Sequence, residues 1–137
     1  MTILLAEDNP DDVLLFKRLL DKVSPDLNIH VVRDGAETIE YLSGAGAFAN
    51  PTAHPPPSLI LLDIRMPKMS GLEVLEWIRR HPKLHRLPVV MLTDSDSKEH
   101  LARAYELKVN SYLNKRPSMG LPEVFKDLME QWAGRQI

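Results

Sequence analysis

Acidic side chains follow two short apolar runs in this chain of 137 residues. An unbroken aliphatic run over 59–62 ends at Asp63, and a second run over 3–6 ends at Glu7 and Asp8. Short runs of this kind are typical of strands buried on both faces, and ligands collect at the carboxyl ends of such strands in open α/β sheets. A single Asp at a strand end is also common in turns. Two strands that both end in acids favour a functional site.

Two further polar side chains take corresponding positions. An apolar run over 88–92 ends at Thr93, and a shorter, more polar run over 111–114 ends at Lys115. Taken singly, Thr93 is explained as a helix cap and Lys115 as a solvated charge. If the strands are parallel neighbours, however, three acids, one hydroxyl and one ammonium group meet at one edge of the sheet: Glu7, Asp8, Asp63, Thr93 and Lys115.

This combination of groups predicts phosphoryl chemistry at a magnesium site. Three neighbouring carboxylates repel one another unless a cation is present, and Mg²⁺ prefers carboxylate, carbonyl, water and phosphate oxygens. A carboxylate can act as a nucleophile towards a phosphoryl donor and form an acyl phosphate. Mg²⁺, Lys115 and the Thr93 hydroxyl would then neutralise charge on the transferred group.

The elements that must position these groups follow from the apolar periodicity. The pattern predicts five strands that alternate with five helices, with the second strand, at 27–32, nearer a sheet edge. Such alternation implies a doubly wound parallel sheet whose right-handed crossovers place all strand ends of one kind on one edge. The first helix is expected from Asn9 and Pro10 to Val23, with Asp11 and Asp12 as favourable charges at its start. Three more are expected over 36–42, from the Ser70 capping box to His81, and over 97–107 with Leu101, Ala104, Tyr105 and Leu107 inward. A closing helix is expected from Pro122, with Val124, Phe125, Leu128, Met129 and Trp132 as its apolar stripe.

Composition excludes several classes of protein. The length suits one domain over residues 1–137, and 44% hydrophobic with 26% charged residues is typical of a globular chain. A net charge of −2 gives no basic footprint for nucleic acid or a membrane surface. With no cysteine and no long apolar run, we expect a cytoplasmic protein without disulfides or a membrane segment.

Neither the Pro-rich segment nor the histidines of this chain indicate a binding site. Residues 44–57 hold four prolines and two glycines and are expected to form a surface loop, not a dinucleotide-binding motif. No ligand spacing relates His54, His81, His85 and His100, so a zinc site is not expected.

Over residues 2 to about 133 the chain resembles the receiver domain of two-component response regulators. The resemblance rests on four segments, at 4–9, 61–71, 89–93 and 112–115, of which the acid followed by Met66, Pro67 and Gly71 is the most specific. It implies a flavodoxin-like fold with strand order 2-1-3-4-5. By the same resemblance, Asp63 would accept a phosphoryl group from a histidine kinase.

The resemblance also implies roles for the other residues of the edge. Glu7, Asp8, Asp63 and the backbone carbonyl of Arg65 would hold Mg²⁺. Thr93 and Lys115 would grip the phosphoryl oxygens, while Tyr112 matches the aromatic switch that turns inward as the Thr93 loop closes. A core role for Tyr112 is the alternative.

Asn9-Pro10-Asp11-Asp12, together with the Pro-rich loop, resembles single-domain receivers that serve phytochrome-type histidine kinases. We expect no DNA-binding or enzymatic module, a downstream protein target, and a possible homodimer through the last helices. Two positions depart from the family pattern. Arg116 separates Lys115 from Pro117, and Asp94 stands where a small residue usually follows the threonine.

Three functions are weighed. The first is a phosphorylation switch with self-phosphorylation and self-dephosphorylation chemistry but no other enzymatic activity. The second is an interaction module that is not phosphorylated, which Asp94 and Arg116 favour and the intact Asp63, Thr93 and Lys115 set opposes. The third is a phosphohydrolase of the haloacid dehalogenase type, which would need a second acid at the position of Arg65.

Overall fold

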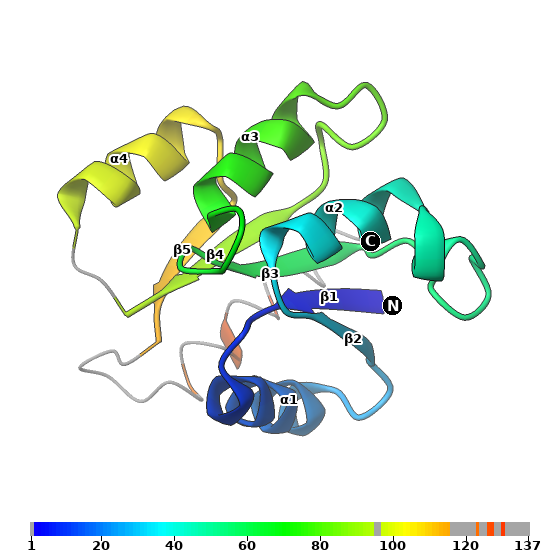
Figure 1. The fold of residues 1–137 in the computed structure, drawn as a ribbon. Helices are drawn as coiled ribbons and strands as arrows, with labels where there is room; N and C mark the ends of the chain where they lie inside the picture. The colour runs from blue at the N-terminus through cyan, green and yellow to red at the C-terminus, as the bar shows by residue number, and fades with distance from the viewer. Residues whose placement is uncertain (1, 95–96, 116–122, 124–125, 128–129, 131–137) are drawn as a thin grey trace.

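Five parallel strands form a single sheet at the centre of the molecule (Figure 1). The structure, a computed structural model, describes residues 2–94, 97–115, 123, 126–127 and 130. The strand order is β2-β1-β3-β4-β5, which confirms the predicted doubly wound, flavodoxin-like fold. The strands are β1 (Thr2–Ala6), β2 (Asn28–Val32), β3 (Leu59–Asp63), β4 (Val89–Thr93) and β5 (Ser111–Asn114).

Helices cover both faces of this sheet. Helix α1 (Pro10–Val23) lies on one face, and α2 (Gly35–Ser43), α3 (Gly71–Arg80) and α4 (Lys98–Glu106) lie on the other (Figure 1). Four α-helices, not the predicted five, are therefore found in the described part of the chain. The apolar residues of the predicted closing helix, from Val124 to Trp132, lie outside the described residues.

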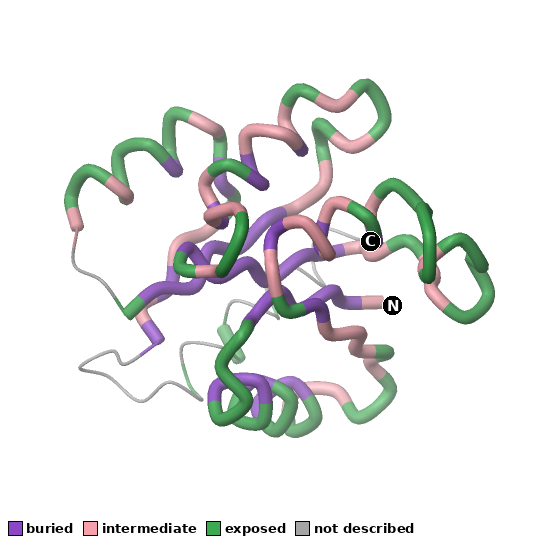
Figure 2. Tube along the Cα trace, in the orientation of Figure 1, coloured by how far each residue is buried: buried purple, intermediate pink, exposed green. Residues whose placement is uncertain are grey.

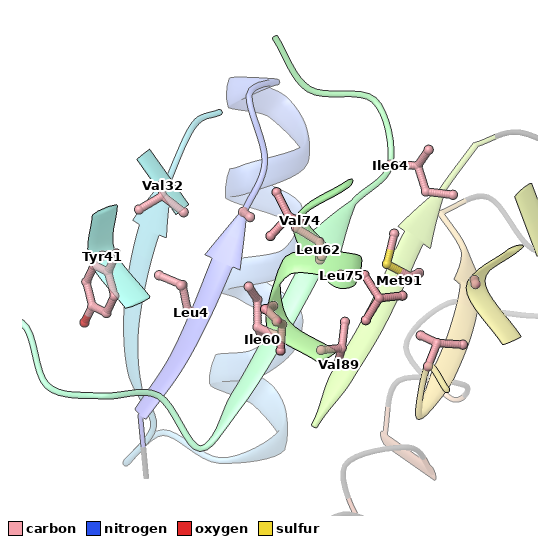
Figure 3. Packing of buried hydrophobic residues seen from close by; sticks show 14 residues of the cluster. Leu4, Val32, Tyr41, Ile60, Leu62, Ile64, Val74, Leu75, Val89 and Met91 are labelled. Atoms are coloured by element: carbon pink, nitrogen blue, oxygen red, sulfur yellow. The ribbon is translucent and has the colours of Figure 1, made fainter. Parts of the chain in front are cut away.

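Alternate residues of each central strand pack against opposite helical layers. In β3, Leu59 and Leu61 join the cluster beneath α1, whereas Ile60 and Leu62 join the cluster beneath α2, α3 and α4 (Figure 3). Buried residues accordingly follow β1, β3 and β4 through the middle of the molecule (Figure 2). Burial on both faces explains why the sequence of β3 is continuously apolar.

The predicted helix caps are confirmed. The Asn9 side chain accepts hydrogen bonds from the backbone N–H groups of Asp11 (2.9 Å) and Asp12 (3.4 Å) at the start of α1. At the start of α3, the Ser70 hydroxyl accepts a hydrogen bond from the N–H of Glu73 at 3.3 Å. These side chains satisfy backbone donors that have no partner within the helix.

The predicted inner face of α4 is confirmed for Ala104 and Leu107 and wrong for Leu101 and Tyr105. Leu101 and Tyr105 were expected inside, but they are 38% and 57% exposed. The inward stripe consists of His100, Ala104 and Leu107, which are spaced by four and three residues. Because a histidine occupies this stripe while two larger apolar residues face outward, hydrophobicity alone misplaces the buried face.

Residues 44–57 form the expected surface loop, with one short 3₁₀ turn at Gly46–Phe48. Aromatic side chains fix the loop to the rest of the molecule, since the ring of His54 contacts those of Tyr41 and Phe48. The Tyr41 hydroxyl also donates a hydrogen bond to the carbonyl of Pro55 at 2.8 Å. Within the described residues, none of the helices combines the length and apolar character needed to cross a bilayer.

Candidate functional site

Three of the predicted site residues meet at the carboxyl ends of the strands. The Lys115 ammonium lies 2.6 Å from Glu7 Oε2 and 3.1 Å from Asp63 Oδ2. All three residues are buried, although they come from three widely separated parts of the sequence. Sheet topology alone brings them together, as the sequence predicts.

Asp63 is held in place by backbone contacts around the end of β3. Its Oδ1 accepts a hydrogen bond from the N–H of Arg65 at 3.3 Å. The N–H of Gly71 donates to the carbonyl of Ile64 at 2.8 Å, which brings the start of α3 against the end of the strand. A Cβ atom on Gly71 would overlap the backbone carbonyl of Asp63. Glycine is therefore required here because the helix approaches the strand so closely.

Thr93 reaches the same edge on the neighbouring strand. In the register of β3 with β4, Asp63 pairs with Leu92, so Thr93 is the next residue along. Thr93 is buried, and its carbonyl accepts a hydrogen bond from the N–H of Lys115 at 2.7 Å. The backbones that carry the hydroxyl and the ammonium group are thus directly linked.

Asp8 completes an acidic cluster with Glu7 and Asp63. One carboxylate oxygen from each of these residues lies within 4.8 Å of the others, and Asp8 is exposed while the other two acids are buried. Asp8 and Arg65 also line an open hollow beside the cluster, to which Met66, Pro67 and His100 contribute. Among the three acids, Asp8 is the one that lines this hollow.

The residues present fit a hard divalent cation. Oxygen ligands of Mg²⁺ lie about 2.1 Å from the ion, so opposite ligands are about 4.2 Å apart, which the spacing of the cluster permits. Glu7 Oε2 is buried, and Lys115 Nζ lies 2.6 Å from it. The acids supply the carboxylate oxygens that such a cation prefers.

Burial controls the protonation of this cluster. Burial raises the pKa of Glu7 from its ordinary value of 4.5 to about 7. Lys115 opposes this rise, and the negative charge of Asp63 adds to it. Burial also raises the pKa of Asp63, again opposed by Lys115. For Lys115, burial alone would lower the pKa, but Glu7, Asp63 and Asp12 outweigh it and raise the pKa above its ordinary value. The lysine therefore stays charged, while Glu7 and Asp63 resist ionisation.

Sequence reasoning missed one member of the site, Asp12. Its Oδ2 lies 3.1 Å from Lys115 Nζ and accepts a hydrogen bond from it, and the residue is only 5% exposed. In the sequence, Asp12 was explained as a favourable charge at a helix start. A signal was nevertheless present, because Asp12 stands four residues before Phe16 and so shares the buried stripe of α1.

Other positions singled out in the sequence differ in how far they are buried. Tyr112 is half-buried and packs against the core beneath α2, α3 and α4. Asp94 is exposed, and Arg116 lies outside the described residues. Among the described residues, the one group of three potential metal ligands is the acidic cluster, and it contains no histidine.

Comparison with known proteins agrees with this geometry. Residues 3–121 match the family model of the response regulator receiver domain. Response regulator Rcp1 of Synechocystis sp. is 40% identical over 124 residues, which cover 90% of this chain and 81% of the relative.

Two solved structures are similar throughout. The phosphorylated cyanobacterial phytochrome response regulator RcpA has a TM-score of 0.87 at 37% identity, and the Mn²⁺-bound form of Rcp1 has a TM-score of 0.84 at 36% identity. Each comparison covers 96% of this chain and 93% of the other. With its strand order, its acidic edge and these relatives, the chain belongs to the response regulator receiver domain family of two-component signalling.

Proposed function

We propose that this protein is a phosphorylation-dependent signalling switch in which Asp63 accepts a phosphoryl group from a sensor histidine kinase in a Mg²⁺-dependent reaction. The observation that carries the proposal is the position of Lys115 Nζ, 3.1 Å from Asp63 Oδ2 and next to an acidic cluster that suits a divalent cation. A nucleophilic oxygen, a fixed cation and a metal site lie within one small volume. Phosphoryl transfer requires this kind of positioning and charge neutralisation.

The reaction assigns one role to each side chain. An Asp63 carboxylate oxygen forms a bond to phosphorus while the phosphorus–nitrogen bond of a phosphohistidine breaks, and the imidazole nitrogen leaves with that electron pair. Lys115 and the Thr93 hydroxyl then bind phosphoryl oxygens. Glu7, Asp8, Asp63 and the backbone carbonyl of Arg65 would hold Mg²⁺, which supplies positive charge to the acids and the transferred group.

Sensor histidine kinases are the partners of response regulators, and the relatives suggest a phytochrome-type kinase here. RcpA is described as a phytochrome response regulator, and it is similar to this chain over nearly its whole length. The Mn²⁺-bound form of Rcp1 likewise supports the assignment of a divalent cation.

Phosphorylation would act by shifting a population of conformations. A phosphoryl group that binds the Thr93 hydroxyl favours the state in which Thr93 points inward, and Tyr112 follows it. The contacts of α4 and β5 with a downstream protein target, or with a second copy through the last helices, would change in consequence.

Phosphorylation in vitro tests the proposal. Protein incubated with Mg²⁺ and a phosphorylated histidine kinase, or with acetyl phosphate, is expected to gain an acid-stable, base-labile adduct. The adduct should disappear in Asp63→Asn and on chelation of Mg²⁺, and it should persist in Asp26→Asn, which changes an exposed aspartate. Absence of an adduct with a cognate kinase would instead support a receiver-like interaction module, and rapid turnover of a small phosphate ester would support an enzyme.

A further inference from the structure

The ammonium group of Lys115 has three carboxylate partners, which differ in kind. Glu7 Oε2, Asp63 Oδ2 and Asp12 Oδ2 lie 2.6, 3.1 and 3.1 Å from Nζ. Glu7 and Asp63 also belong to the acidic cluster that suits a metal ion, whereas Asp12 does not. Asp12 is therefore the one carboxylate of the three that contacts the lysine from outside the acidic cluster.

This division matters when a divalent cation occupies the acidic cluster. A cation bound to Glu7 and Asp63 takes up the negative charge that otherwise stabilises the ammonium, and it adds repulsion at short range. A buried lysine without a partner would carry a large desolvation penalty. Asp12 lies outside the cluster, so it stays next to the ammonium as a partner when the cation is bound.

The local structure holds Asp12 firmly in this place. It lies in the first turn of α1, where its N–H donates to the Asn9 side chain at 3.4 Å. Its carboxylate points inward, on the stripe that contains Phe16. Asp11 occupies the same turn and interacts with the same helix dipole, but it is exposed. The helix dipole therefore does not explain why the Asp12 carboxylate points inward.

We propose, on the basis of the function proposed above, that Asp12 is a positioning residue for Lys115. It retains the ammonium group within the site when Glu7 and Asp63 are engaged by a divalent cation, and so keeps Lys115 within reach of the phosphoryl group. Asp12 itself touches neither the cation nor the reacting atoms. Its effect on phosphorylation passes through the lysine.

Direct observation of the lysine side chain tests the proposal without reference to activity. In ¹⁵N-lysine-labelled protein, an ion-paired buried ammonium gives an NMR signal protected from exchange with water, and Lys115→Met identifies the signal. The wild type is expected to keep this signal in excess Mg²⁺. Asp12→Asn should show it without Mg²⁺ and lose it when Mg²⁺ is added, whereas the matched control Asp11→Asn should behave as the wild type does. Retention of the signal by Asp12→Asn in Mg²⁺, or its loss from the wild type, would overturn the proposal.

Phosphorylation kinetics supply the second readout. The initial rate in Asp12→Asn should fall about tenfold, the usual size of one lost charge-assisted hydrogen bond. Asp12→Glu, which restores the negative charge, should recover most of the rate, and Asp11→Asn should not change it. An equal fall in both asparagine variants would mean that these acids act only on the helix, and would contradict a positioning role. If the wild type itself is not phosphorylated, the proposed function fails, yet the NMR comparison still decides the role of Asp12.

Discussion

Two clusters of titratable side chains lie buried or half-buried in this molecule, and they are built differently. The strand-end cluster comprises Glu7, Asp12, Asp63 and Lys115, with three carboxylates around one ammonium. The histidine cluster lies where the 44–57 loop covers β2 and α2, and its ring centroids are 5.1–6.0 Å apart. It comprises His30, Tyr41, Phe48 and His54.

The same physical cause acts on both clusters with opposite results. Burial disfavours the charged form of any group, so it raises the pKa of Glu7 and Asp63 and lowers the pKa of His30. In the histidine cluster, this effect favours the neutral form of His30, and the rings pack against one another. The strand-end cluster instead retains more acids than its one lysine can neutralise. An excess of buried negative charge is unfavourable for stability and suitable for a cation, which distinguishes a site from a structural cluster.

The largest expected effect comes from removal of the one cation in the strand-end cluster. Lys115→Met leaves buried carboxylates without a partner, and we expect it to lower the free energy of unfolding by about 3–5 kcal/mol at neutral pH in a chelator. Urea denaturation measures this loss. Excess Mg²⁺ should recover more stability in the variant than in the wild type. Lys17→Met removes an exposed lysine and serves as the control; an equal loss in both variants would refute the interpretation.

The second prediction concerns Glu7 and pH. Between its unfolded pKa of 4.5 and its folded pKa of about 7, the folded protein binds a proton that the unfolded chain has released. The stability that this proton contributes is complete below pH 4.5 and is lost as the pH rises through about 7. Gln cannot ionise. In a chelator, the free energy of unfolding of Glu7→Gln relative to that of the wild type should therefore rise by about 3 kcal/mol between pH 4.5 and about 7.

Denaturant titrations at a series of pH values measure this difference. Glu40→Gln, which changes an exposed acid, should follow the wild-type curve. Saturating Mg²⁺ should remove the difference, because the cation favours ionised Glu7. A constant gap between Glu7→Gln and the wild type at every pH would show that Glu7 does not titrate in this range.

The contrast between the clusters also explains how far the sequence could be interpreted. Asp63 and Lys115 were predicted to meet because strand order and crossover handedness determine which ends of the strands share an edge. Asp12 was not recognised, since a general preference for acids at helix starts accounted for it. The contact of His30 with His54 depends on the path of a Pro-rich loop that has no periodicity. Tyr105 was misplaced because spacing does not reveal which side of a helix faces the sheet.

A smaller effect is expected from the one hydrogen bond that fixes the loop over the histidine cluster. Tyr41→Phe removes the hydroxyl that donates to the Pro55 carbonyl but keeps the ring. The free energy of unfolding should fall by about 1 kcal/mol, the usual net contribution of such a bond. Thermal or urea denaturation measures the change, and Tyr105→Phe, at a 57% exposed position, should have no effect. A larger loss would indicate that the hydroxyl supports more than the loop.

The smallest expected effect has the opposite dependence on pH. Because the pKa of His30 is lowered, chiefly by burial and also by His54, the unfolded chain binds a proton more readily than the folded protein does. Stability from this group is complete above the unfolded pKa of 6.5 and is lost as the pH falls below it. His30→Phe, which keeps a ring in the cluster, should therefore flatten the stability curve between about pH 5.5 and 7.5.

Saturating Mg²⁺ keeps the strand-end cluster from titrating in the same interval, and His85→Phe, at an exposed position, is the control. If His30→Phe and the wild type lose stability in parallel as the pH falls, burial does not lower the pKa of His30, and the contrast between the two clusters fails.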